Sequence, residues 1–426
     1  MAREELEQLK PNLRFPKFRD SSSWDARTLN DYCERLTATV GANKLTPVSI
    51  TAGKGFVAQA EKFGRDISGA QYSQYIHLRR GDFAYNRGNS KRFPQGSVYE
   101  LTEFSEAAAS NAFYCFRLHD DCEPGFFTGL FERNAHGLQL ARDITSGARS
   151  TGLLNISAGA FFGITIPMPE AHAEQKMIAD CLRSLDDLIA AERRKFEALR
   201  ARRQGLMQQL FPQAGDSLPR LRFREFRSAR EWKEEKLDDL ATPGTGHTPS
   251  KAIAENYNGG IKWVSLADSK RLDRGVISET SIEISEEGIK NSSAVMHPAG
   301  SVVLSRDAGV GKGAVLGGPM AVSQHFIVWT CKPSRLSNWF LYYQLQSLKP
   351  VFERIATGNT IKTIGLPYFK SMRIAVPQLR EQHRIAECLS SLDALLDLQG
   401  QKLDALGMHK RGLLQQLFPV VKGNER

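Results

Sequence analysis

The 426-residue chain ends two long segments in nearly the same way, with GLMQQLFP at 205–212 and GLLQQLFP at 412–419. A shift of about 207 positions aligns the segment 174–212 with 381–419, and about 20 of the 39 aligned positions are identical. Self-similarity of this extent indicates that one structural unit has been duplicated. The chain must therefore fold in a way that uses the same ending twice.

The beginnings of the two halves also match. PNLRFPKF starts at Pro11 and is followed by Trp24, and PRLRFREF starts at Pro219 and is followed by Trp232. A proline-bearing lead-in, ITIPMPE or IAVPQLRE, precedes each repeated ending. The residues between beginning and ending show no comparable similarity. The sequence predicts a tandem repeat in which the frame of each half has persisted while the middle has diverged.

Each repeated ending has the apolar spacing of a coiled coil, because isoleucine and leucine recur with heptad periodicity over about five heptads. Such a helix of about 40 residues, at ~1.5 Å per residue, would be roughly 60 Å long. The predicted seam consists of Leu182, Leu185, Ile189, Glu192, Phe196, Leu199, Arg203 and Leu206 in the first copy, and of Leu392, Leu396, Gln399, Leu403, Leu406, Lys410 and Leu413 in the second.

Four polar residues interrupt this seam, and polar seam residues commonly fix the register of a coiled coil. If the two helices pair antiparallel, one register sets Glu192 opposite Lys410 and Arg203 opposite Gln399, so that every polar group meets a compatible partner. The pair would give the chain a pseudo-two-fold axis. The alternative is that each helix packs only on its own domain.

Composition limits the class of protein. With 41% hydrophobic residues the chain can fill two or three cores, and a formal charge of +10 with a pI near 9.3 favours a polyanionic partner. No stretch approaches the ~18 consecutive apolar residues of a membrane span, and the N-terminal MAREELEQLK lacks the apolar segment of a signal peptide. We expect a cytoplasmic protein with no membrane partner. None of the six cysteines falls in a pattern of zinc spacing, so we expect no metal.

The whole layout resembles the specificity subunit of type I restriction-modification enzymes. The matching features are the LRFPxF-like beginning, a variable domain, the IPxP lead-in and an EQxxIAxxLxxLD helix that ends in GLxQQLFP, all present twice. The resemblance implies two target recognition domains of α/β (mixed α+β) structure, separated by two long helices that form an antiparallel coiled coil. It divides the chain into recognition domains at 1–165 and 213–375 and spacer helices at 166–212 and 376–426.

The middles contain basic segments that suit double-stranded DNA. Arginine and lysine interleaved with glycine and aromatic residues can approach a phosphate backbone, and arginine also reads guanine edges. The candidate contacts are Arg79, Arg80, Arg87, Lys91, Arg92 and Arg149 in the first domain, and Lys251, Lys262, Arg306, Lys312 and Lys362 in the second. The alternative for each is a solvated basic hairpin with no base contact.

Signatures of catalysis are missing from the sequence. An amino-methyltransferase should carry an FxGxG-like loop and an (N/D)PPY motif, and neither is present; HExxH and a nucleophile elbow are missing too. The stretch VVLSRDAGVGKG at 302–313 lacks the GxxxxGK[ST] order of a phosphate loop. We therefore expect a non-catalytic reader without a cofactor of its own.

The resemblance implies that catalysis belongs to partners: methyltransferase subunits, two of them, that use S-adenosylmethionine, and restriction subunits that use ATP and Mg²⁺. Two alternatives stay open at this point. One is a divergent single-chain modification enzyme, and the other is a coiled-coil scaffold that binds DNA without sequence preference.

Overall fold

The computed structural model describes residues 9–88, 93–144, 153–213, 216–357, 363–419 and 421. The chain forms two compact units: unit 1 comprises residues 1–193 and 401–426, and unit 2 comprises residues 194–400. Each long helix therefore contributes one part to each unit. Within the described residues, no helix is long and apolar enough to cross a membrane.

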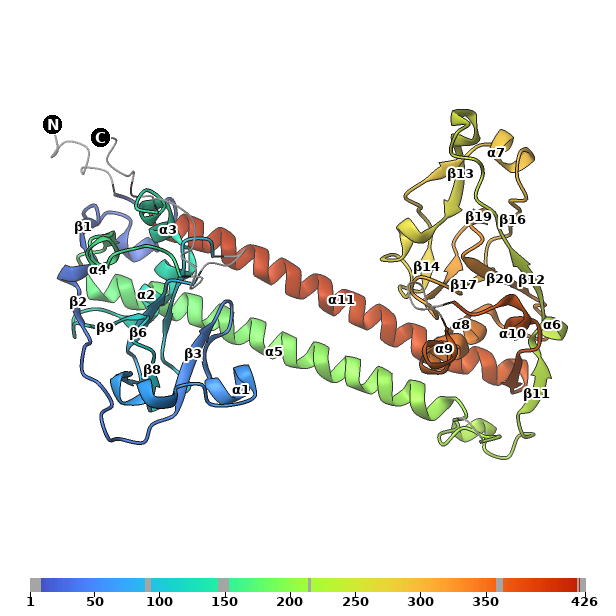
Figure 1. Ribbon diagram of the computed structural model, residues 1–426, viewed down its shortest axis with the longest axis horizontal. Helices are drawn as coiled ribbons and strands as arrows, with labels where there is room; N and C mark the ends of the chain where they lie inside the picture. The colour runs from blue at the N-terminus through green and yellow to red at the C-terminus, as the bar shows by residue number, and fades with distance from the viewer. Residues whose placement is uncertain are drawn as a thin grey trace. The chain divides into compact units, whose positions relative to one another are not determined.

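Unit 1 consists of three antiparallel or mixed sheets with short helices (Figure 1). Its strands are β1 (Asp25–Thr28), β2 (Cys33–Arg35), β3 (Pro47–Thr51), β4 (Gly55–Ala58), β5 (Ile76–Arg79), β6 (Phe83–Asn86), β7 (Ser97–Glu100), β8 (Glu106–Ala109), β9 (Tyr114–Leu118) and β10 (Thr165–Met168). Its helices are α1 (Gln59–Phe63), α2 (Pro124–Glu132), α3 (Ala135–Leu140), α4 (Ala158–Phe162) and the first part of α5 (His172–Leu210). The sheet orders are β2-β9-β6-β7, β4-β3-β8-β5 and β1-β10.

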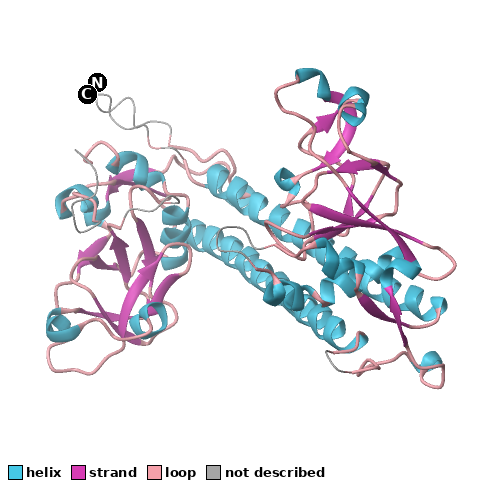
Figure 2. Cartoon of the chain, turned by 45° about the vertical axis from the view of Figure 1, so that its right-hand side comes forward, coloured by secondary structure: helices cyan, strands magenta, loops and turns pink. Residues whose placement is uncertain are grey.

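Unit 2 has the same kinds of element (Figure 2). Its strands are β11 (Lys233–Lys236), β12 (Ala241–Thr245), β13 (Tyr257–Val264), β14 (Val276–Ile277), β15 (Glu283–Ile284), β16 (Met296–His297), β17 (Val302–Ser305), β18 (Gly313–Leu316), β19 (Met320–Val322), β20 (Phe326–Cys331) and β21 (Arg373–Val376). Its helices are α6 (Leu237–Leu240), α7 (Glu286–Lys290), α8 (Asn338–Ser347), α9 (Lys349–Ile355), α10 (Leu366–Lys370) and the first part of α11 (Leu379–Leu417). The sheet orders are β12-β20-β17-β18-β14, β15-β13-β19-β16 and β11-β21.

The diverged middles share a four-stranded antiparallel arrangement, to which β14 adds a fifth, parallel strand in unit 2. In unit 1, β9 pairs with β2 and β6, and β6 pairs with β7. In unit 2, β20 pairs with β12 and β17, and β17 pairs with β18. The sequence does not reveal this correspondence, because a strand requires only suitable burial and backbone pairing, which many side chains satisfy. The duplication therefore includes the middles as well as the frame.

The repeated LFP ending closes the core of the unit that contains it. The Phe211 ring lies 5.5 Å from that of Phe340 in α8. In unit 1, the Phe418 ring lies 5.1 Å from that of Phe126 in α2 and 6.4 Å from that of Trp24. Both phenylalanines are buried. Apolar burial of this kind is the main stabilising contribution in a core, which explains why each half keeps the ending.

The repeated Glu-Gln pair at the start of each long helix holds the beginning of the same half. Arg14 forms a two-pronged salt bridge to the buried Glu174, with both contacts at 2.7 Å, and the Trp24 indole donates to Glu174 at 3.3 Å. Arg222 and Trp232 contact Glu381 at the same distances in unit 2.

The glutamine of each Glu-Gln pair forms a hydrogen bond to the start of a second helix in the same unit. Gln175 accepts the backbone N–H of Glu123 at the start of α2 at 3.0 Å, and Gln382 accepts that of Ser337 at the start of α8 at 2.8 Å. Both bonds satisfy a backbone donor that a helix end leaves open. The frame residues are thus repeated because the same contacts are made twice.

The two long helices run antiparallel within each unit, but the predicted register is wrong. In unit 1, Glu192 accepts from Lys402 at 2.5 Å, and Lys410 lies 2.5 Å from Asp186. In unit 2, Arg203 pairs with Asp393. Lys410 and Arg203 thus pair with aspartates in place of the expected Glu192 and Gln399, because the helices are shifted by about one heptad from the predicted register. A shift of one heptad leaves an apolar seam intact.

The fifteen predicted seam residues are all buried or half-buried, whereas their neighbours on α5 and α11 are mostly exposed. The prediction of two mixed α/β domains and an antiparallel pair of long helices is confirmed. The boundary between the two compact units falls within the long helices. The predicted division of the chain into four segments, with boundaries at 165, 212 and 375, therefore stays a prediction.

Candidate nucleic-acid interface

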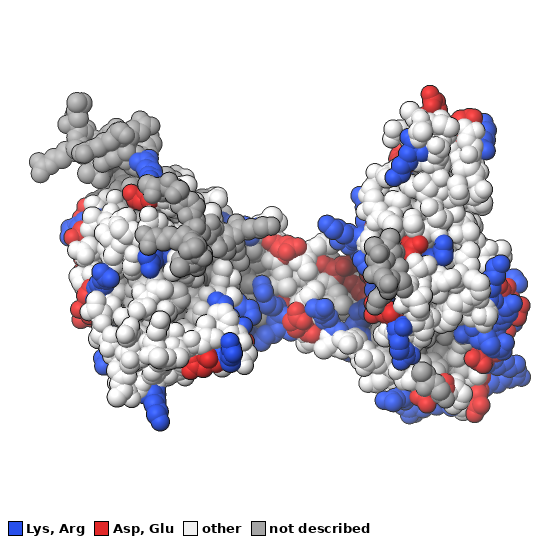
Figure 3. All heavy atoms as spheres, viewed as in Figure 1, with Lys and Arg blue, Asp and Glu red and all other residues white. Residues whose placement is uncertain are grey.

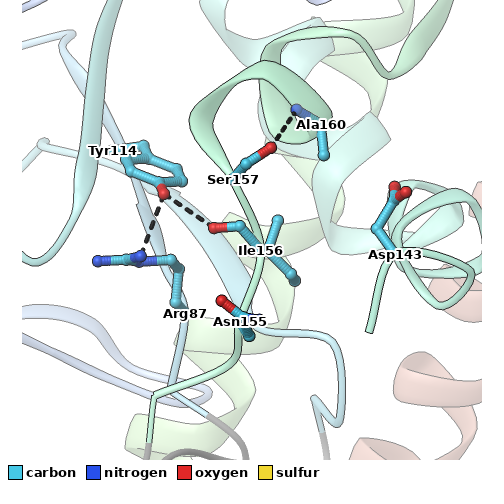
Figure 4. Close-up of a pocket in the computed structure, with 7 residues that line it drawn as sticks. All are labelled: Arg87, Tyr114, Asp143, Asn155, Ile156, Ser157 and Ala160. Carbon is cyan, nitrogen blue, oxygen red and sulfur yellow. Dashed lines mark hydrogen bonds between the residues drawn. The ribbon is translucent and has the colours of Figure 1, made fainter. Parts of the chain in front are cut away.

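The end of strand β6 in unit 1 carries a tightly bonded arginine. Arg87 Nε donates to the carbonyl of Ala112, and its terminal nitrogen donates to the Tyr114 hydroxyl, both at 3.1 Å. The guanidinium also lies 4.6 Å from the centre of the Tyr114 ring, within range of a cation–π contact. The Tyr114 hydroxyl donates in turn to the carbonyl of Ile156 at 2.8 Å (Figure 4).

These groups line a pocket of about 410 Å³. It is formed by Arg87, Tyr114, Asp143, Asn155, Ile156, Ser157 and Ala160, and Ser157 caps α4 by accepting the backbone N–H of Ala160 at 3.0 Å (Figure 4). Guanidinium, phenol, amide and hydroxyl groups offer both donors and acceptors. The pocket therefore suits hydrogen-bonding recognition, and its lining offers no nucleophile activated by an adjacent base.

The end of strand β17 in unit 2 also carries a bonded arginine. Arg306 Nε donates to the carbonyl of Gln324 at 3.0 Å, and its terminal nitrogen donates to the carbonyl of Ile364 at 3.4 Å. The next residue, Asp307, lies 2.8 Å from the ring nitrogen of His325. The predicted Arg87 and Arg306 thus both donate hydrogen bonds to residues of their own unit.

Two of the lysines predicted in unit 2, Lys312 and Lys262, also form hydrogen bonds within that unit. Lys312 donates to the carbonyl and hydroxyl of Ser269 at 3.1 and 3.0 Å. Lys262 donates to the carbonyl of Ser278 at 2.6 Å and to Glu279 at 2.5 Å. Since each ammonium group already has acceptors, contact with DNA would require it to share or exchange them.

Three predicted residues lie on the surface. Arg79 ends β5 and is 63% exposed, with Glu106 at 3.6 Å. Arg80 and Lys251 are exposed, and within the described part of the chain their side chains have no hydrogen-bond or ion-pair partner. These three are the side chains most open to a phosphate group. Lys91, Arg92, Arg149 and Lys362 lie outside the described residues.

Sequence reasoning missed Tyr114 and Asn155. Two arginines contact the Tyr114 ring: the Arg35 guanidinium lies 5.8 Å from its centre and that of Arg87 lies 4.6 Å from it. Tyr114 belongs to no basic segment, and Asn155, although it lies in the segment of Arg149, is uncharged, so the pattern of basic residues indicates neither of them. Only the pairing of β9 with β2 and β6 brings the three side chains together.

Burial, rather than a catalytic neighbour, accounts for the perturbed ionisable groups. Complete burial lowers the pKa of His136 to about 4, and burial raises the pKa of the Cys115 thiol to about 12. Within the described ranges, no group of three His, Cys, Asp or Glu side chains could hold a metal ion. On the face drawn in Figure 3, basic and acidic side chains are interspersed over each unit. Buried, uncharged groups of this kind are typical of a structural interior.

Comparison with known proteins extends this description. Residues 229–407 match the family described as "Type I restriction modification DNA specificity domain". The MjaVIII specificity subunit of Methanocaldococcus jannaschii is 24% identical over 286 residues, which are 65% of this chain and 66% of that protein. The EcoR124I/EcoR124II specificity subunit of Escherichia coli is 29% identical over 172 residues, or 39% of this chain and 41% of that protein.

Two solved structures have a similar fold. One is the type I restriction-modification system S subunit from M. genitalium, with a TM-score of 0.60, 15% identity and coverage of 97% of this chain and 100% of that one. The other belongs to a study of complex assembly and conformational transition in a type I R-M system, with a TM-score of 0.56, 19% identity and coverage of 93% and 97%.

The duplicated frame and the equivalent sheets of the two units define a two-unit repeat protein. The sequence alignments span 39% to 66% of the curated relatives' own length. Over these ranges and within the matched residues 229–407, the chain is similar to the specificity subunits of type I restriction-modification systems.

Proposed function

We propose that this chain is the DNA sequence-recognition subunit of a type I restriction-modification complex and reads an asymmetric target in two parts. The observation that carries the proposal is the repetition of one recognition architecture with different side chains. β6 and β17 end at the same place in equivalent sheets, yet Gly88 follows the arginine in one unit and Asp307 in the other. Two similar surfaces with different chemistry suit two different base sequences.

Exposed basic residues would supply the affinity. Arg79, Arg80 and Lys251 can neutralise phosphates without losing a buried partner, and such contacts position a protein on DNA without specifying sequence. The polar groups around Arg87 and Arg306 include donors suited to base edges. The 3.6 Å contact of Arg79 with Glu106 is exposed and therefore contributes little that DNA binding would forfeit.

The chain would act without a cofactor of its own. Methyl transfer from S-adenosylmethionine and ATP- and Mg²⁺-dependent cleavage would belong to methyltransferase and restriction subunits that assemble on it. Two methyltransferase subunits are expected, because the frame is present twice in the chain. The family match and the relatives' names support the specificity role on which this arrangement depends.

Selection from random double-stranded DNA tests the proposal. The full chain, purified with the subunits that accompany it, should enrich two short and different sequence blocks separated by a constant number of unread base pairs. Enrichment of no sequence, together with affinity that falls steeply as salt rises, would instead indicate a scaffold that binds DNA through phosphates alone. Methyl transfer by the isolated chain would indicate a single-chain modification enzyme.

A further inference from the structure

We propose that Arg87 and Arg306 are equivalent positioning residues, which hold the DNA-reading segments of their units in place rather than contact DNA themselves. The inference rests on the proposed function and assigns to these two residues a task that the family assignment does not. It is carried by two independent arrangements in one chain. Three sets of contacts coincide between them.

The first set is in the backbone. Arg87 directly follows β6, and its carbonyl accepts the N–H of Leu154 at 2.9 Å. Arg306 directly follows β17, and its carbonyl accepts the N–H of Ile364 at 2.8 Å. An isolated bridge adjoins each bond, Gly88 with Leu153 and Asp307 with Thr363. In both units the residue after a central strand thus ties down the chain that leads to the next short helix, α4 or α10.

The second set involves Nε of each arginine. Arg87 donates to the carbonyl of Ala112, which lies two residues before β9. Arg306 donates to the carbonyl of Gln324, which lies two residues before β20. Since β9 and β20 occupy equivalent places in their sheets, the two hydrogen bonds hold equivalent turns, one in each unit.

The third set reaches back to the segment before the short helix. The terminal nitrogen of Arg306 donates directly to the carbonyl of Ile364. That of Arg87 donates to the Tyr114 hydroxyl, which relays the contact to the carbonyl of Ile156. The tyrosine makes up the extra distance in unit 1. One guanidinium therefore connects a strand end, a turn and a third segment in each unit.

The chemistry of arginine explains why this residue type occurs twice. Its donors are spread over a rigid plane and can serve two acceptors in different directions, whereas the donors of lysine sit on a single nitrogen. Guanidinium groups that already hold two acceptors are poorly placed to leave them for a phosphate. Both residues are also only partly exposed, unlike Arg80 and Lys251.

Methionine variants of the full chain, in its complex, test this role, because methionine keeps an unbranched stem and removes every donor. Arg87→Met should weaken base preference in one block of the selected target and leave the other unchanged. Arg306→Met should do the reverse. For both, the slope of log K against log salt should stay at the wild-type value, since no phosphate contact is lost.

Two results in the DNA experiment would overturn the inference. One is unchanged preference in both blocks. The other is a salt slope smaller by about one unit, which is the signature of a lost phosphate contact. Arg80→Met and Lys251→Met are the matched controls, and we expect them to reduce that slope while base preference stays the same.

A second measurement does not depend on DNA. Hydrogen exchange at the Leu154 amide should be about fivefold faster in Arg87→Met, which corresponds to ~1 kcal/mol for a lost hydrogen bond, and the Ile364 amide should respond likewise to Arg306→Met. Arg87→Lys should recover only part of the protection. Unchanged exchange would contradict the positioning role, even if wild-type protein enriched no DNA sequence and the proposed function itself had failed.

Discussion

Lys410 Nζ lies 2.5 Å from an oxygen of Asp186, across the helix pair of unit 1. The same relationship recurs in unit 2 with the helices exchanged. Arg203 pairs with Asp393, and both residues stand 207 positions from their counterparts (410 − 203 and 393 − 186). A residue from the recognition domain completes each pair: Glu132 contacts Lys410 at 2.5 Å, and the Tyr343 hydroxyl donates to Asp393 at 2.8 Å. The duplicated ion pair thus links helix to helix and helix to domain.

Charge reversal at Lys410 should destabilise unit 1. Lys410→Glu would place three carboxylates together around a position that is only 11% exposed, and we expect a loss of about 2 kcal/mol in the free energy of unfolding. Asp186→Lys in the same chain should restore part of it. Glu192→Lys should restore nothing, because Glu192 pairs with Lys402. Urea denaturation measures all three, and rescue by Glu192→Lys would contradict the observed register.

Truncation of the repeated phenylalanine should damage one unit at a time. Phe418→Ala removes the ring that packs on Trp24 and Phe126, and Phe211→Ala removes the ring that packs on Trp232 and Phe340. Each change should cost about 3–5 kcal/mol, as is usual for a buried phenylalanine.

The tryptophan fluorescence of the truncated proteins during denaturation should show an early transition in the affected unit. Leu398→Ala is the control, because that side chain is 63% exposed on α11 and its loss should change stability by no more than about 0.5 kcal/mol. An equal effect of the control and of Phe418→Ala would show that the repeated ending does not close a core.

The stability of the folded chain should decrease as the pH is lowered, because of the buried His136. His136 is buried beside Phe131 and Tyr85, neither ring nitrogen has a partner within the described residues, and burial lowers its pKa to about 4. The unfolded chain binds a proton near the ordinary value of ~6.5 and the folded chain does not. Stability is therefore complete above pH ~6.5 and declines as pH falls toward 4.

The same histidine provides its own control. His136→Phe should remove much of the decline between pH ~7 and ~5, a window in which ordinary carboxylates stay ionised. His383→Phe, at an exposed position, should leave the decline unchanged. Urea midpoints at the two pH values measure the effect, and identical pH dependence in wild type and His136→Phe would rule out this histidine as its source.

The sequence predicts the frame well because the frame depends on local patterns. Heptad spacing identifies the helices, and the beginning that contains Arg14 and Trp24 recurs because both residues contact one buried glutamate. The register escapes prediction, since a shift of one heptad leaves every apolar seam residue on the seam. The deciding partners, Glu132 and Tyr343, come from elsewhere in the chain.

The candidate site, unlike the frame, is poorly predicted by the sequence. Basic segments indicate which parts of each middle can meet a polyanion, but they do not show which side chains are already occupied. Arg87 and Arg306 stand in unrelated sequence contexts, and only the pairing of β6 and β17 in equivalent sheets makes them counterparts. A contact with a backbone carbonyl does not depend on which residue supplies the carbonyl, so the sequence does not indicate that Tyr114 belongs to the site.

Competition binding with the selected duplex tests the central claim most directly. At fixed salt, the complex should prefer the selected duplex over a scrambled one of equal length by a factor of at least ~10³, the usual lower limit for specific recognition. Scrambling either block alone should remove a large part of that preference, because two different units each read one block. Equal affinity for selected and scrambled duplexes at every salt concentration would contradict the claim that this chain reads sequence.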